Sequence, residues 1–290
     1  MNRRSLLTSA LLGAAALALR PAFAVTGNPQ ALVERLAALE RRHGGRLGVS
    51  ILDSGSGQRV THRGDERFLM CSTFKLFAVA AVLARVDRGA EQLDRRVVFG
   101  KDALLRYAPI TSLHVGPSGM SVADLCGAAI TVSDNTAANL LLARLGGPAA
   151  VTAFTRGLGD TVTRFDRIEP ELNVASPGDI RDTTTPNAAL ATLQKLLLGS
   201  ALSRSSREQL LTWLHGCTTG TDKLRAGVPA DWTVGEKTGS GSQNESNDVG
   251  ILIPPNRPPL LVTGYYAGSN VDAATRSAVL AEVGRIAATI

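Results

Sequence analysis

Apolar residues recur at helical spacing along most of the chain. Leu32, Leu36 and Leu39 lie three or four positions apart and Gly44-Gly45 follows, so the pattern predicts a first helix over residues 29–43. The same spacing, interrupted by Gly, Pro or Asp, predicts further helices over residues 72–87, 122–130, 136–145, 148–158, 186–198, 205–215 and 271–290.

Strand-like segments lie near the two ends of the sequence. Residues 46–53 and 58–62 flank a Gly/Ser-rich turn, and residues 232–237, 248–253 and 259–266 follow the helical block. These five segments most simply join in one antiparallel sheet covered by the terminal helices. The sequence therefore predicts an α/β (α+β) fold, with a discontinuous α/β sheet domain at residues 25–63 and 218–290. An all-α domain is expected at residues 64–217.

The first 24 residues have the pattern of an export signal. Arg3 and Arg4 precede an apolar run, and Ala22-Phe23-Ala24 forms a small-x-small cleavage site, so the mature protein is expected to start at Val25. The apolar run is too short for a stable membrane anchor. Asn2-Arg3-Arg4-Ser5 fits a twin-arginine signal, and a general secretory route fits nearly as well, so the export route stays open.

Composition narrows the class of protein. Hydrophobic residues make up 44% and charged residues 19%, which is typical of a folded globular protein. Removing residues 1–24 takes away three arginines and no acid, so the formal charge falls from +6 to +3, and no basic cluster with interleaved aromatics suggests nucleic-acid binding. The three cysteines, Cys71, Cys126 and Cys217, lack metal-site spacing; one disulfide pair stays open.

Ser72 and Lys75 form the first motif that can carry chemistry. A serine hydroxyl attacks poorly until a nearby base takes its proton, and a lysine three residues later lies on the same helical face. The amino end of a helix also favours an oxyanion. A solvated helix surface is the alternative for an isolated S-x-x-K, but Met70, Phe74 and Phe77 indicate burial, which favours a neutral amine.

Three further short stretches could contribute to the same site. Ser133-Asp134-Asn135 lies between two helices, where Asp134 is expected to cap the second. Glu169-Pro170-Glu171-Leu172-Asn173 reads alone as an acidic loop, and Lys237-Thr238-Gly239 ends a strand, where it could simply protect a sheet edge.

Together and in this order, the four stretches resemble the signature of the class A serine β-lactamases. The resemblance covers nearly all of the mature chain. It implies that Ser72 is the nucleophile, that Ser133 passes a proton to the leaving nitrogen, and that Glu169 activates the deacylating water. Whether Lys75 or Glu169 is the base for acylation is left open. The residues implied to contact substrate or that water are Asn135, Asn173, Lys237, Thr238, Gly239, Ser240 and Tyr107.

The resemblance also implies structural roles and some departures. Arg167 and Asp182 match a salt bridge that the family has across the neck of the Glu169 loop. Pro170 follows Glu169 where the family has a cis peptide bond, and Asn139 is expected to steady the same loop. Lys223 and Arg276 are candidates for a second substrate-binding cation, each also explained as a surface residue. Gly241 stands where some carbapenem-hydrolysing relatives have a cysteine partner for the residue matching Cys71.

These observations predict a periplasmic class A serine β-lactamase that confers antibiotic resistance. It would act as a monomer on penicillins or cephalosporins, without metal, cofactor or nucleic-acid partner. A D,D-peptidase would lack the Glu169 loop, and an inactive binding module would show a broken motif. A Ser-His-Asp hydrolase is disfavoured because the four histidines fall outside every motif. A metallohydrolase is disfavoured because the sequence contains no H-E-x-x-H motif. Substrate spectrum and inhibitor response are not encoded in motif spacing.

Overall fold

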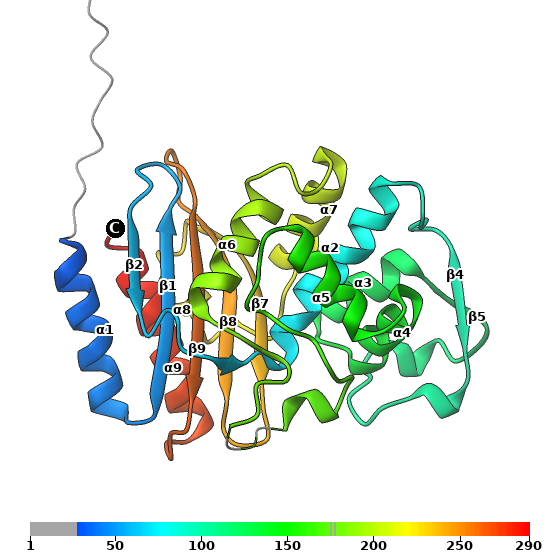
Figure 1. Ribbon diagram of the computed structural model, residues 1–290, viewed down its shortest axis with the longest axis horizontal. Coiled ribbons are helices and arrows are strands. Elements are labelled where there is room, and N and C mark those ends of the chain that lie inside the picture. The colour runs from blue at the N-terminus through cyan, green and yellow to red at the C-terminus, as the bar shows by residue number, and fades with distance from the viewer. Residues whose placement is uncertain (1–27, 175, 177) are drawn as a thin grey trace, which may run out of the picture.

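The computed structural model describes residues 28–174, 176 and 178–290, and a five-stranded antiparallel sheet lies at its centre (Figure 1). The strand order is β2-β1-β9-β8-β7. The strands are β1 (Arg46–Asp53), β2 (Arg59–His62), β7 (Thr233–Ser240), β8 (Ser246–Ile253) and β9 (Leu260–Ala267). Strands from both ends of the sequence therefore share one sheet, which confirms the predicted fold class. The expected export segment, residues 1–24, lies outside the described residues.

Three helices cover the outer face of the sheet: α1 (Pro29–His43), α8 (Leu224–Gly227) and α9 (Ala273–Ala287). The Asn28 side chain caps α1 by accepting from Gln30 N, and Gly44, with φ 69°, ends the helix as predicted. The apolar stripe of α1 packs with α9 and the sheet in one core cluster. This layer buries the back of β8 and β9.

The opposite face of the sheet adjoins a block of helices (Figure 1). At its centre lies α2 (Phe74–Asp87), whose sequence is apolar almost all round, the pattern of a fully buried helix. Around it are α3 (Val122–Thr131), α4 (Asn135–Leu145), α5 (Pro148–Gly157) and α7 (Arg204–His215). Helix α6 (Pro186–Leu197) packs instead against β1 and β9.

Short elements in the helical block differ from the prediction. Two ribbons of paired strands, β3 (Phe68–Leu69) with β6 (Thr183–Thr184) and β4 (Arg96–Phe99) with β5 (Gly116–Ser121), were not predicted. A two-residue strand carries no alternation to detect, and β5 contains Gly and Pro. The other short elements are 3₁₀ turns at Cys71–Thr73, Lys101–Ala103, Thr111–Leu113 and Glu171–Asn173.

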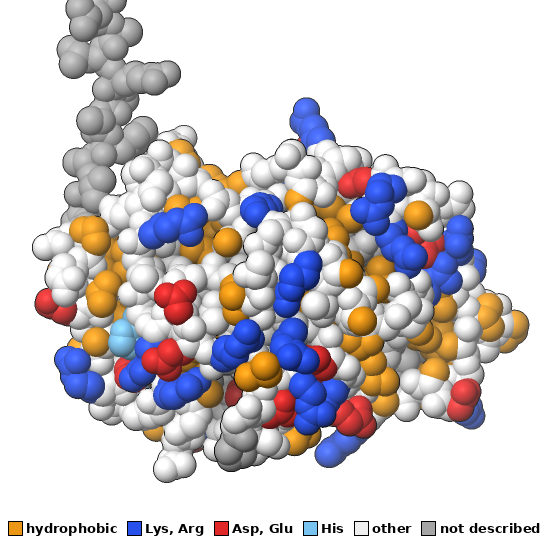
Figure 2. Space-filling view, viewed as in Figure 1, with side chains coloured by type: hydrophobic (Ala, Val, Ile, Leu, Met, Phe, Trp, Pro, Cys, Tyr) orange, Lys and Arg blue, Asp and Glu red, His pale blue; other side chains and the backbone are white. Residues whose placement is uncertain are grey.

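The end of the molecule that carries β4 and β5 exposes several apolar side chains (Figure 2), and Val98 is 62% exposed. All three cysteines are free thiols and buried. The residues that the structure describes therefore contain no disulfide. Among the described residues, no single helix is both long and apolar enough to cross a bilayer, and α4 with α5 meets that test only as a pair bent by 70°.

Candidate active site

Ser72 lies in a 3₁₀ turn between β3 and α2, at the amino end of the buried helix. The preceding residue, Cys71, has φ 47°, a conformation that costs energy for any residue other than glycine. Ser72 Oγ donates a hydrogen bond to Glu169 Oε1 at 3.2 Å. Helical spacing predicted that the Lys75 amine points toward this hydroxyl; in the described part of the chain, the hydrogen-bond partner of Ser72 Oγ is Glu169.

Lys75 is completely buried, as its apolar neighbours predicted. Its Nζ donates to Ser133 O at 2.7 Å and to Asn135 Oδ1 at 2.6 Å, and lies 3.1 Å from Glu169 Oε1. Burial lowers the pKa of Lys75, and the nearby Glu169 carboxylate opposes that shift. The amine therefore connects three of the four motifs.

Ser133 occupies the tight turn between α3 and α4, with φ 61°. Its hydroxyl accepts hydrogen bonds from Lys75 Nζ at 3.2 Å and Lys237 Nζ at 3.0 Å. Asp134 caps α4 as expected, accepting from Ala137 N at 2.9 Å. A hydroxyl between two lysines is well placed to transfer a proton.

Lys237 is buried on β7 and projects toward Ser133. Its Nζ also donates to the Thr238 carbonyl at 2.8 Å. Burial, together with the nearby Lys75 charge, lowers the pKa of Lys237 to about 7. The ammonium lacks a carboxylate partner within the described residues and is therefore suited to an anionic ligand.

The rest of the K-T-G stretch lies at the end of β7. The Thr238 hydroxyl lies 2.5 Å from that of Thr219. A Cβ added to Gly239 would lie 2.7 Å from Met70 O and 3.2 Å from Ser72 N, so only glycine lets the strand pack on the nucleophile turn. Ser240 is the last residue of the strand and is exposed.

Glu169 is held in place through both its backbone and its side chain. Asn139 Nδ2 donates to Glu169 O, and Glu169 N donates to Asn139 Oδ1, each at 2.9 Å. Asn173 Nδ2 donates to Glu169 Oε2 at 2.5 Å. The Glu169–Pro170 peptide is cis. Asn139 thus contacts the loop that it is expected to steady, and the peptide is cis as expected.

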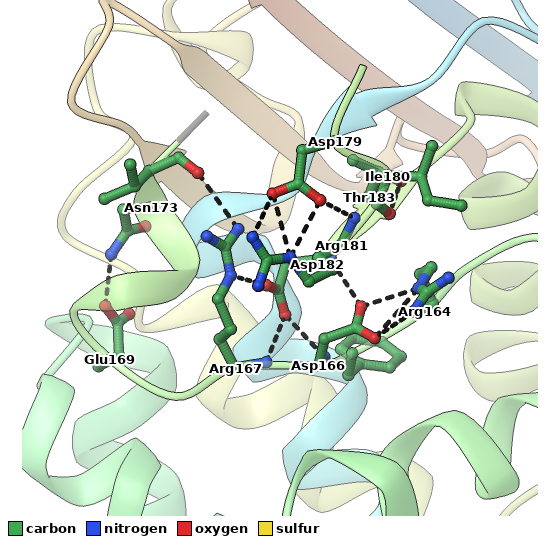
Figure 3. Close-up of polar contacts among 12 residues, drawn as sticks. Arg164, Asp166, Arg167, Glu169, Asn173, Asp179, Ile180, Arg181, Asp182 and Thr183 are labelled. Carbon is green, nitrogen blue, oxygen red and sulfur yellow. Dashed lines mark hydrogen bonds and ion pairs between the residues drawn. The ribbon is translucent and has the colours of Figure 1, made fainter. Parts of the chain in front are cut away.

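Ion pairs close the neck of this loop (Figure 3). Arg167 Nε lies 2.6 Å from Asp182 Oδ2, which confirms the expected salt bridge. Two flanking pairs, Arg164 with Asp166 and Arg181 with Asp179, were missed by the sequence analysis. Alternating arginine and aspartate residues at positions 164–167 and 179–182 were the available signal.

Three other candidate residues have different surroundings. Tyr107 is 50% exposed, and its carbonyl accepts from Asn135 N at 3.0 Å. Lys223 was interpreted as more often a surface residue, but it is only 6% exposed, and its Nζ donates to Ser246 Oγ at 3.1 Å. Arg276 Nη1 donates to Val271 O at the start of α9. Lys223 thus lies beside the end of the K-T-G strand, because Ser246 pairs with Ser240.

A buried pair of acids behind β7 was also missed. Neither Glu236 nor Asp248 is exposed, and Arg225 Nε donates to Glu236 Oε1 at 2.9 Å while Leu224 N donates to Asp248 Oδ2 at 3.1 Å. Burial raises the pKa of Glu236 to about 9, and the Asp248 charge adds to that rise. Within the described chain, no group of His, Cys, Asp and Glu side chains could hold a metal ion.

Comparisons with known proteins agree with this geometry. The profile of the β-lactamase enzyme family matches residues 31–290. Beta-lactamase OXY-1 of Klebsiella oxytoca is 45% identical over 287 residues, covering 99% of this chain and 98% of the relative. The carbapenem-hydrolyzing beta-lactamase KPC, also from Klebsiella oxytoca, is 47% identical over 266 residues, covering 91% and 90% of the two chains. The structure of an ancestral class A beta-lactamase is 62% identical with a TM-score of 0.87, covering 88% of this chain and 98% of that one.

Proposed function

This chain belongs to the class A serine β-lactamases, a family of hydrolases, and on that premise we propose that it hydrolyses the amide bond of penicillins and cephalosporins through an acyl-enzyme on Ser72. Such hydrolysis would confer resistance to these antibiotics. The observation that carries the proposal is the convergence on Glu169, whose Oε1 lies 3.2 Å from Ser72 Oγ and 3.1 Å from Lys75 Nζ.

Acylation begins with attack of Ser72 Oγ on the lactam carbonyl. The hydroxyl proton passes to Glu169, its hydrogen-bond partner, while Lys75 connects Glu169 to Ser133 through its own hydrogen bonds. Ser133 then gives a proton to the lactam nitrogen as the C–N bond breaks. Lys75 restores the Ser133 proton and takes the proton held by Glu169, which leaves Glu169 ionised for deacylation. Lys75 acting directly on Ser72 is the competing route, which the lowered pKa of Lys75 also permits.

The substrate is held by groups on two sides of Ser72. Lys237 supplies positive charge and Thr238 a hydroxyl for the substrate carboxylate, and the amide of Asn135 binds the acylamino side chain. The backbone N–H groups of Ser72 and Ser240 form an oxyanion hole. Gly239 leaves room for the ligand along the strand. Tyr107 forms a wall of the cleft.

Deacylation uses the Glu169 loop. Glu169 takes a proton from a water molecule as the water attacks the acyl carbonyl, and the proton returns to Ser72 as the ester bond breaks. Asn173 supports this water: its Oδ1 is buried without a hydrogen-bond partner among the described residues, and it is therefore free to accept from the water.

Residues 1–24 support export, by the twin-arginine or the general secretory route, and we place the mature enzyme in the periplasm as a monomer. Purified enzyme should hydrolyse a chromogenic cephalosporin, and Ser72→Ala should abolish hydrolysis without unfolding the chain. A folded wild-type enzyme that neither hydrolyses the cephalosporin nor gains the mass of a penicillin on Ser72 would refute the proposed function.

A further inference from the structure

Asn247 is a buried polar residue without an assigned role, and it lies directly behind the nucleophile. It is 1% exposed and sits on β8 opposite Gly239 of β7. Paired residues in an antiparallel sheet point to the same face, so the Asn247 side chain faces the Ser72 turn as Gly239 does. Its Nδ2 donates to Leu69 O at 2.9 Å and to Met70 O at 3.0 Å.

Met70 O is the point at which the nucleophile turn is fixed. Besides the Asn247 amide, it accepts from Thr73 N at 3.2 Å and from Thr73 Oγ1 at 2.8 Å. The two residues after Met70 are Cys71, with its left-handed φ, and Ser72 itself. A strained turn persists only where its surroundings hold it, and the Asn247 amide is a side chain of the sheet that binds this turn.

The two proposed oxyanion donors lie on opposite sides of this attachment. Ser72 N belongs to the turn, whereas Ser240 N belongs to the end of β7, next to Gly239. The spacing between the donors therefore depends on how firmly the turn is docked on the sheet. Packing across Gly239 prevents a closer approach, and the Asn247 hydrogen bonds prevent separation.

We propose that Asn247 is a positioning residue that sets the geometry of the oxyanion hole by binding the Leu69 and Met70 carbonyls. The inference rests on the proposed function, since it assumes an acyl-enzyme on Ser72. Donors in such a hole lie about 2.7–3.1 Å from the oxyanion, and losing one costs roughly 10²–10³-fold in rate. A loosened turn weakens one donor without removing it.

The test compares Asn247→Leu, which keeps the branching and the number of heavy atoms but loses both hydrogen bonds, with the milder Asn247→Ser. Thr263→Val is the matched control, because Thr263 is also buried and donates to two carbonyls, Ser50 O and Pro186 O, away from the turn. For each protein, the thermal midpoint, the kcat/KM for a penicillin, which reports on the steps up to and including acylation, and the affinity for an arylboronic acid are measured.

Asn247→Leu should have a kcat/KM at least about tenfold below that of the parent and bind the boronic acid more weakly by a similar factor, with a smaller loss for Asn247→Ser. Thr263→Val should lower the thermal midpoint yet keep the parent kcat/KM. A kcat/KM within twofold of the parent in either folded Asn247 variant would overturn the inference while leaving the proposed function intact. A folded parent that neither hydrolyses the penicillin nor gains its mass on Ser72 would instead refute the proposed function.

Discussion

The Glu169 carboxylate lies 3.1 Å from the Lys75 ammonium, and neither side chain is exposed to solvent. A buried pair of this kind is tightly coupled, because removing one partner leaves the other charge without compensation. Glu169 opposes the fall in the pKa of Lys75 that burial causes. Substituting Glu169 should therefore also favour the neutral form of Lys75.

Glu169→Ala should separate acylation from deacylation. Because the variant lacks the base for water but keeps Lys75, which can accept the Ser72 proton by the competing route, turnover should fall by about 10²–10⁴-fold and a penicillin adduct should persist on Ser72. Intact mass spectrometry after mixing checks this. Glu171→Ala is the control, since Glu171 is an exposed acid in the same loop. An adduct that disappears as fast as in the parent would remove Glu169 from deacylation.

Lys237 should impose an alkaline limit on substrate capture. Its pKa is lowered to about 7, so the free enzyme loses the ammonium that binds the substrate carboxylate as the pH rises through that value. The profile of kcat/KM should therefore fall above about pH 7. Lys237→Arg keeps a positive charge and should move the fall to higher pH. If kcat/KM of this variant still falls near pH 7, the fall must be caused by the titration of another group.

The Arg167–Asp182 pair should matter more to stability than its neighbour on the loop. Arg167→Ala leaves the buried Asp182 carboxylate without its ion partner and should cost on the order of 3 kcal/mol. Arg181→Ala breaks a pair with Asp179 in which the arginine side chain is 53% exposed, and it should change the free energy of unfolding little. Urea unfolding measures the free energy of unfolding of the two variants. Equal losses of this free energy would contradict the idea that burial makes the Arg167–Asp182 pair more important.

Local features of the sequence were enough to predict part of this site. The apolar neighbours of Lys75 predicted its burial, and Asp134 was correctly predicted to cap helix α4. Asn247 and Glu236 carried no such signal, because their environments arise from pairing between strands far apart in sequence and from packing of α8 on the sheet. The sequence also contained no sign that Lys223 is buried, because its contact with Ser246 joins residues that are far apart along the chain.

The buried Glu236–Asp248 pair should make the free energy of unfolding depend on pH. Glu236 Oε2 and Asp248 Oδ1 are both buried. If both groups are ionised, neither oxygen has a hydrogen-bond partner among the described residues. A proton on Glu236, donated to Asp248, would satisfy both atoms, and the raised pKa of Glu236 agrees with that state.

The folded protein then holds this proton up to about pH 9, whereas the unfolded chain releases it near the ordinary glutamate value of 4.5. Between these values the folded state binds more protons, so this group makes the free energy of unfolding fall as the pH rises, by at most about 1.4 kcal/mol per pH unit. Asp248, whose pKa is raised to about 6, adds to the slope only at the acid end.

Glu236→Gln tests this directly, because its amide can accept from Arg225 and donate to Asp248 without titrating. Urea unfolding at pH 6, 7, 8 and 9 should give a flatter dependence for the variant than for the parent, with the variant gaining relative stability toward pH 9. Parallel curves would mean that Glu236 is already ionised at neutral pH. In that case the Arg225 guanidinium would have to hold the charge alone, and Glu236→Gln should destabilise the protein equally at every pH.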